Sequence, residues 1–112
     1  MRQLLAFLLC VGFSSGLSAG SKTITANIVQ LGVVTSQYGN VKFDTPLDIA
    51  GHPCATSSEL GSFDKATPHG EHIFTMLLSA HMAGRPVKIY YSDNACGLWS
   101  SQALISRVYI EN

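Results

Sequence analysis

Polar and apolar residues begin to alternate at Thr23, and Ile24, Ala26 and Ile28 fall on the apolar side. This two-residue period predicts a half-buried β-strand. Apolar residues then crowd around Gly32, and a glycine inside such a strand favours a bulge or bend. The pattern therefore predicts a first strand that turns a corner near Gly32, as strands of small barrels do.

A hairpin is predicted next, because residues 38–40 read Tyr-Gly-Asn and the alternation resumes directly after them. Pro46 limits the length of the returning strand. The stretch over residues 51–62 is less regular. A short third strand is expected there or just beyond, around Cys54 or Phe63.

Residues 68–83 are predicted to form a helix. Thr67 suits the N-cap and Pro68 the first helical position, while Gly84 is the expected left-handed stop. Apolar side chains cover well over half of the circumference, which is more than packing on one sheet requires. Either loops of the same chain or another subunit must cover the surplus.

Two more strands are predicted after the helix, over residues 87–91 and 104–110, because both runs alternate and are rich in β-formers. A turn is expected after the first at Asp93, and Leu104 is expected to face the same side as Val108 in the second. The order of strands, one helix and strands predicts a mainly β fold. We expect a small, partly closed barrel of about five strands with the helix across one end.

The N-terminal segment has the pattern of a secretory signal peptide. A basic residue, Arg2, precedes an apolar run over residues 4–13 that is too short to span a bilayer, and small residues follow it. We therefore expect residues 1–20 to be a signal peptide and residues 21–112 to be a single secreted or periplasmic domain. No membrane span is expected after processing.

Without Cys10, which lies in the signal peptide, the domain has two cysteines, Cys54 and Cys96. Two such residues in an oxidising compartment normally pair, and two separate free thiols are the alternative. A zinc site would need further ligands, and neither cysteine has a CxxC partner or a histidine at ligand spacing. The sequence therefore predicts a disulfide and no metal site.

Composition and motifs exclude several functions. The 112 residues are 46% hydrophobic and 12% charged, and seven Lys and Arg balance seven Asp and Glu. This balance leaves no basic field for nucleic acid. His69 and His72 are interpreted as solvated histidines, since no third metal ligand is fixed near them. No nucleophile elbow, Cys-His pair or phosphate loop is present, so we expect neither an enzyme nor a cofactor.

Four aromatic residues are the best candidates for stacking on a sugar or anchoring a protein: Tyr90, Tyr91, Trp99 and Tyr109. Trp99 follows Cys96 closely, and we expect it to pack on the disulfide. Alternation forces Tyr90 and Tyr91 to opposite faces of their strand. The sequence leaves open which of the two faces solvent.

Two segments carry a resemblance to a known family. Residues 83–91 read Ala-Gly-Arg-Pro-Val-Lys-Ile-Tyr-Tyr and residues 32–38 read Gly-Val-Val-Thr-Ser-Gln-Tyr. Both resemble segments of the receptor-binding B subunits of subtilase-cytotoxin-like bacterial toxins. The resemblance implies an OB-type barrel, a ring of five subunits with the helices at its centre, and recognition of sialylated cell-surface glycans. Tyr91 matches a sugar-contacting tyrosine of that family, whereas Leu31 stands where the family has its sialic-acid-binding serine.

Two functional hypotheses follow. The first is a secreted binding module, an OB-like barrel that recognises a glycan through Tyr90, Tyr91, Ser36 and Gln37. Its expected partners are further copies of the chain, through helix 68–83, and an enzymatic partner chain. The second is a structural or inhibitory domain that binds another protein.

Overall fold

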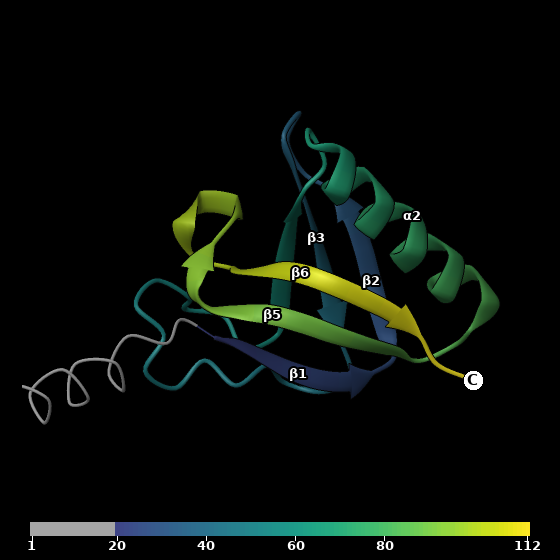
Figure 1. Cartoon of the computed structure of the whole chain (residues 1–112), viewed down its shortest axis with the longest axis horizontal. Helices are drawn as coiled ribbons and strands as arrows, with labels where there is room; N and C mark the ends of the chain where they lie inside the picture. The colour runs from purple at the N-terminus through teal and green to yellow at the C-terminus, as the bar shows by residue number, and fades with distance from the viewer. Residues whose placement is uncertain (1–19) are drawn as a thin grey trace, which may run out of the picture.

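The structure, a computed structural model, describes residues 20–112, which form a six-stranded sheet and one long helix (Figure 1). The elements are β1 (Ser21–Ala26), β2 (Ile28–Val33), β3 (Tyr38–Phe43), β4 (Leu60–Asp64), α2 (Pro68–Ala83), β5 (Val87–Cys96), the short 3-10 helix η1 (Leu98–Ser100) and β6 (Ala103–Ile110). The predicted class, mainly β with a helix, is confirmed. The predicted signal peptide covers residues 1–20, and of these only Gly20 belongs to the described part of the chain.

The sheet turns a sharp corner at Asn27. Its strand order is β1-β5-β6-β4-β3-β2, so β1 and β2 form opposite edges although Asn27 alone separates them in the chain. The backbone and side-chain amides of Asn27 donate to the carboxylate of Asp44 at 2.9 and 3.0 Å. These two hydrogen bonds hold the pKa of Asp44 below its usual value, and the bond from the Asn27 side chain has the larger effect. The corner curls the sheet into a partly closed barrel.

The predicted corner at Gly32 is therefore wrong in position. Gly32 is regularly paired with Asn40 in the β2–β3 ladder, and the bulge of β2 lies at Val29 instead. The physical reason is that Asn27 makes hydrogen bonds that stabilise a corner. Gly32 offers only a backbone that can adopt more conformations, and this does not stabilise any one of them. A bend forms where the freed backbone groups find partners.

The predicted hairpin exists, but its turn lies earlier, at residues 34–37. Thr35 Oγ1 accepts a hydrogen bond from the Tyr38 amide at 2.8 Å and closes this turn. Gly39, expected in the turn, is inside β3, where a Cβ atom would lie 2.5 Å from the ring of Phe63. The glycine serves close packing rather than a turn.

Helix α2 begins and ends at the predicted residues. Thr67 Oγ1 accepts a hydrogen bond from the Gly70 amide at 3.0 Å, and Gly84 has a φ of 67° in the left-handed region. The helix lies beside β2, β4 and β6 (Figure 1). It buries Gly70, Ile73, Leu77 and Ala80 against them. The helix thus covers the open side of the curled sheet.

Strand β5 continues through the turn predicted at Asp93 and ends at Cys96. The Asp93 amide donates to the Gly20 carbonyl at 3.2 Å, so this part of β5 remains attached to the chain entering β1. The turn was predicted from residue type alone. A strand partner supplied by the distant N-terminal segment overrides that local preference.

A second bulge changes the face of β6. Tyr90 pairs with Arg107 and Tyr91 with Ile105, so Ser106 has no partner across the ladder. The bulge reverses the alternation, and Ile105 is buried while Leu104 is only half-buried. The prediction that Leu104 shares the core face with Val108 is therefore wrong.

The topology matches the predicted OB-like barrel when β1 and β2 are counted as one bent strand. That strand, β3 and β4 form an antiparallel meander, and α2 then leads to the β5–β6 hairpin. The hairpin closes onto both sides, since β5 pairs with β1 and β6 runs parallel to β4. The predicted third strand is β4 around Phe63, whereas Cys54 lies in the loop before it.

The core lies inside this barrel and beneath α2. Its largest fully buried side chains are Tyr91, Phe63, Leu77, Ile89, Leu98, Val41 and Val87. They come from β3, β4, β5, α2 and the η1 turn. Smaller buried side chains of β1, β2 and β6, namely Ala26, Ile28, Ala103 and Ile105, complete the core, so every helix and strand contributes to it.

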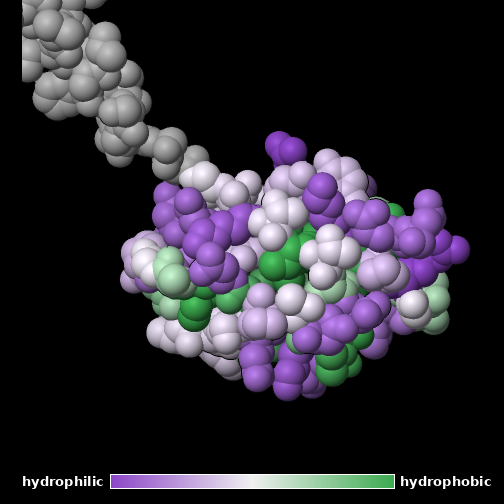
Figure 2. Space-filling view, turned by 90° about the horizontal axis from the view of Figure 1, so that it is seen from below, coloured by the Kyte–Doolittle hydropathy of each residue, from purple (hydrophilic) through white to green (hydrophobic). Residues whose placement is uncertain are grey.

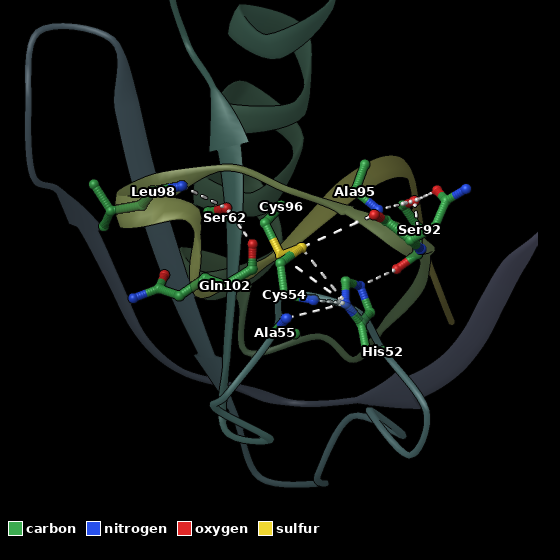
Figure 3. The surroundings of a disulfide bond; sticks show 10 residues. His52, Cys54, Ala55, Ser62, Ser92, Ala95, Cys96, Leu98 and Gln102 are labelled. Carbon is green, nitrogen blue, oxygen red and sulfur yellow. Dashed lines mark hydrogen bonds between the residues drawn. A yellow bond between two sulfur atoms is a disulfide. The ribbon is translucent and has the colours of Figure 1, made fainter.

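The predicted disulfide between Cys54 and Cys96 is present, with a Cα–Cα distance of 6.3 Å (Figure 3). It joins the long β3–β4 connection to the end of β5. Trp99 does not pack on it and is 71% exposed, so that prediction is wrong. Leu98 takes the buried position, because left-handed backbone at Trp99 turns the indole outward.

We expect the double variant Cys54→Ala, Cys96→Ala to lose about 3 to 4 kcal/mol of unfolding free energy, because the bridge no longer restricts the unfolded chain. Urea denaturation followed by circular dichroism measures this loss. A reducing agent should lower the wild-type midpoint to that of the variant and leave the variant unchanged. Equal midpoints for oxidised wild type and variant would contradict this role.

We expect Gly70→Ala to destabilise the domain by about 1 to 3 kcal/mol through overpacking. A Cβ at this position would overlap the carbonyl of Asp64, which is backbone and cannot rotate away. The control is Gly51→Ala, where a Cβ would meet no neighbour within 4 Å, so that its cost comes only from the positive φ of 75° at that residue. Thermal unfolding should show the larger loss for Gly70→Ala, and the reverse order would refute the packing argument.

Candidate functional site

The outer face of β1, β5 and β6 carries a set of aromatic, cationic and hydroxyl side chains. Val87, Ile89 and Tyr91 face the core, so alternation turns Lys88 and Tyr90 outward. Cross-strand pairing adds neighbours from the two flanking strands. We call this set the outer aromatic patch: Thr23, Thr25, Lys88, Tyr90, Arg107 and Tyr109.

Tyr90 lies at the centre of the outer aromatic patch. Its ring centroid is 5.9 Å from that of Tyr109, and the two planes meet at 64°. Lys88 Nζ lies 5.6 Å and Arg107 Cζ 5.5 Å from the Tyr90 ring centroid, which is within the range of cation–π attraction. Lys88 and Arg107 thus stabilise the position of the Tyr90 ring, and their N–H groups provide hydrogen-bond donors at the edge of the aromatic surface.

An open cleft of about 220 Å³ adjoins the patch, between α2 and β6. Arg107 and Tyr109 line it from the strand, and His69, His72 and Met76 from the helix. His69 Nε2 lies 2.7 Å from the Ser106 carbonyl, so this nitrogen carries a proton and donates. Among residues 20–112, no carboxylate lines the cleft or belongs to the patch. The combination suits a ligand with hydroxyl or acidic groups and an apolar face.

The structure separates the four predicted ligand contacts. Tyr91 is 1% exposed, and its hydroxyl accepts a hydrogen bond from the Asp48 amide at 2.7 Å, so its ring offers no surface to a ligand here. Tyr90 is the outward member of the pair. Ser36 and Gln37 lie in the β2–β3 turn, where Gln37 donates to Asp64 at 3.1 Å. The sheet order places β6 and β4 between β5 and β3, which keeps Tyr90 away from that turn.

His52 organises the surroundings of the disulfide (Figure 3). Its Nδ1 accepts hydrogen bonds from the amides of Cys54 and Ala55 at 3.2 and 3.0 Å, so its Nε2 must donate to the Ser92 carbonyl at 3.1 Å. His52, Cys54 and Cys96 bring three ligand atoms within 4.8 Å of one another. Cysteine binds zinc only as a thiolate, however, and the two sulfurs are joined to each other in a disulfide. In this oxidised state the cluster fixes a loop rather than holding a metal.

The carboxylates with altered pKa values lie elsewhere and do not form an acid–base pair. Lys22 Nζ lies 3.1 Å from Asp48 Oδ2. The hydrogen bond between them is the largest cause that lowers the pKa of Asp48 below its usual value. Asp44 is bound to Asn27 as described above. Both shifts favour the ionised form at neutral pH. Neither group is therefore suited to give a proton as a general acid.

Sequence reasoning missed Lys88, Arg107 and the two threonines of the patch. Lys88 was within reach, because it is two residues from Tyr90 in an alternating strand and shares its face. Arg107 joins them through the β5–β6 register, which sets it opposite Tyr90, and Thr23 through the β1–β5 register. These placements depend on pairing between distant segments, which no local pattern encodes.

The face seen from below Figure 1 is mainly hydrophilic, and hydrophobic residues form small separate areas on it (Figure 2). The larger exposed apolar side chains of α2 are Met76, Leu78 and Met82. Within residues 20–112, no helix is both long and apolar enough to cross a membrane. The distinct surfaces of the domain are therefore the outer aromatic patch with its cleft, the exposed apolar side chains of α2, the edge strand β2 with Val29 and Val33, and the exposed Trp99.

In comparisons with known proteins, no family model, no curated protein and no solved structure matches this chain. The resemblance to toxin B subunits therefore stays a prediction. The fold and the geometry of the site carry the functional argument.

Proposed function

We propose that the protein is a secreted or periplasmic, non-enzymatic binding module that recognises a cell-surface glycan through the outer aromatic patch. The observation that carries this proposal is the Tyr90–Tyr109 pair with Lys88 and Arg107 beside it. Tyrosine offers the C–H face of a sugar an apolar plane and its hydroxyls a polar edge. The signal-peptide pattern and the disulfide support export.

The charge of the patch specifies the ligand further. Lys88 and Arg107 are not paired with any carboxylate in the described part of the chain, and the cleft beside them is also lined by the imidazoles of His69 and His72. A sugar with a carboxylate or sulfate group would gain charge-assisted hydrogen bonds here. We therefore propose an acidic glycan as the ligand of this patch. The toxin-like resemblance implies sialylated glycans, which are also acidic, but its matched positions are the buried Tyr91 and Leu31, so the proposal rests on the charge of this patch alone.

We further propose that copies of the chain associate through α2, in a ring of five if the resemblance extends to assembly. Met82 is 80% exposed, and Met76 and Leu78 lie exposed on the same helix. Apolar side chains at this density on a helix gain stability when a neighbouring subunit covers them. An enzymatic partner chain would then bind the assembled ring.

The alternative is a domain that binds another protein through the edge strand β2. Val29 and Val33 are 54% and 62% exposed, and β2 ends the sheet. An open edge with apolar side chains can accept a strand from a partner. Binding of a protein that is abolished by a proline in β2, such as Val33→Pro, would favour this alternative.

We expect the wild-type protein to bind acidic glycans on a glycan array, and Tyr90→Ala to weaken that binding about tenfold, a loss of about 1.4 kcal/mol. Tyr90→Phe keeps the ring and should retain most of the affinity. Arg107→Gln should weaken acidic glycans more than their neutral analogues, because it removes only charge and donors. If Tyr90→Ala bound glycans as well as the wild type, the glycan site would not be the outer aromatic patch. If no glycan on the array were bound, the proposal of glycan recognition would be wrong.

We expect light scattering to give a mass of several subunits for the wild type. The double variant Leu78→Glu, Met82→Glu should shift the protein to monomers, because it places charge in an apolar contact. His72→Glu is the control on the same helix, since this exposed residue lies on the flank toward β6 and the cleft rather than beside Leu78 and Met82. A wild-type monomer at micromolar concentration would refute assembly through α2.

A further inference from the structure

Trp99 is the single tryptophan of the chain, and it points into solvent from the turn that joins β5 to β6. Its side chain is 71% exposed, although tryptophan is a residue that folded proteins usually cover in large part. The turn lies at the opposite end of the β5–β6 hairpin from Lys88 and Tyr109. Trp99 therefore belongs to a surface separate from the outer aromatic patch.

The backbone of this turn is strained in a way that presents the indole. Trp99 and Ser100 have φ angles of 53° and 51°, in the left-handed region that side chains other than glycine rarely adopt. Such strain persists only where the surroundings impose it, and it concentrates at binding sites.

The surroundings impose this conformation through buried contacts (Figure 3). Leu98 is buried, and its amide donates to Ser62 Oγ at 3.2 Å, while the Ser62 hydroxyl donates to the Gln102 carbonyl at 3.2 Å. The Gly97 amide donates to the same carbonyl at 2.9 Å. The disulfide at Cys96 fixes the residue where the turn begins. Trp99 is thus held by a rigid base, which reduces the entropy lost when a ligand binds.

The chemistry around Trp99 is polar but uncharged. Residues 94–106 contain no charged side chain. Within the described residues, the Trp99 indole nitrogen and the hydroxyls of Ser100 and Ser101 make no hydrogen bond to protein. Gln102 Oε1 in the same turn also has no partner, but this atom is buried and does not reach the surface that Trp99 presents. An exposed aromatic plane with unfilled neutral donors and acceptors matches the face and hydroxyls of a neutral sugar.

We propose that the Trp99 turn is a second binding site, specific for a neutral pyranose that stacks on the indole and hydrogen-bonds to Ser100 and Ser101. It shares only the ligand class, carbohydrate, with the function proposed above. An apolar protein pocket is the less suitable occupant, because it would desolvate both serine hydroxyls without replacing their hydrogen bonds. An acidic ligand would find no cation in this turn.

The experiment is a titration of intrinsic fluorescence, since Trp99 is the only tryptophan that contributes to the signal. The probes are lactose, maltotriose and chitotriose, with sialyllactose as the acidic counterpart. We expect a saturable shift of the emission to shorter wavelength with at least one neutral sugar, because stacking removes water from the ring. Calorimetry should show a loss of about tenfold or more in affinity for Trp99→Ala and a smaller loss for Trp99→Phe.

Two controls separate this proposal from the first. Tyr90→Ala should leave neutral-sugar binding unchanged, and Trp99→Ala should leave the unfolding midpoint unchanged, because the side chain makes little buried contact. No spectral change or heat with any neutral sugar overturns the second site. A response limited to sialyllactose and lost in Tyr90→Ala also overturns it, while supporting the outer patch. Protection of Trp99 by a partner protein alone would assign the turn to protein binding instead.

Discussion

The corner at Asn27 is the constraint on which the remaining structure depends. A single residue joins the two edges of the sheet, so the four strands between them must curve until both edges lie beside the same bend. The curvature defines an inner face that encloses the core and an outer face that meets solvent. Asp44 anchors this bend as a carboxylate, and its lowered pKa means that the anchor is present at neutral pH and weakens as pH falls through the folded-state pKa.

Elements encoded by contiguous residues were predictable from the sequence. The bounds of α2 followed from Thr67, Pro68 and Gly84, because caps act within one turn of the helix. The disulfide followed from counting the cysteines outside the predicted signal peptide. The errors occur where a distant segment decides the local conformation. Gly32 had the freedom to bend, but the bend went to Asn27, whose partner lies seventeen positions further along the chain.

The candidate site illustrates the same limit. Alternation alone required one of Tyr90 and Tyr91 to face outward, but the choice depended on the hydrogen bond between Tyr91 and Asp48 and on burial beneath the β3–β4 connection. Arg107 lies beside Tyr90 because the β5–β6 ladder pairs these two residues. Such a register leaves almost no signal in the sequence, since each strand alternates in the same way whichever residues of the other strand it faces. The residue types of the site were therefore visible, and their arrangement was not.

One hairpin accounts for the contrast between the two proposed ligands. β5 and β6 carry Lys88 and Arg107 near the end that adjoins α2, whereas the turn at Trp99 lies in an uncharged stretch at the other end. Because the chain as a whole has no net charge, attraction of an acidic ligand depends on these local cations and decays within about 8 Å at physiological ionic strength. Their field therefore does little at the far turn, where stacking and neutral hydrogen bonds must decide specificity. The disulfide and the buried Ser62 make that turn rigid, so both ends of the hairpin present their aromatic rings in fixed positions.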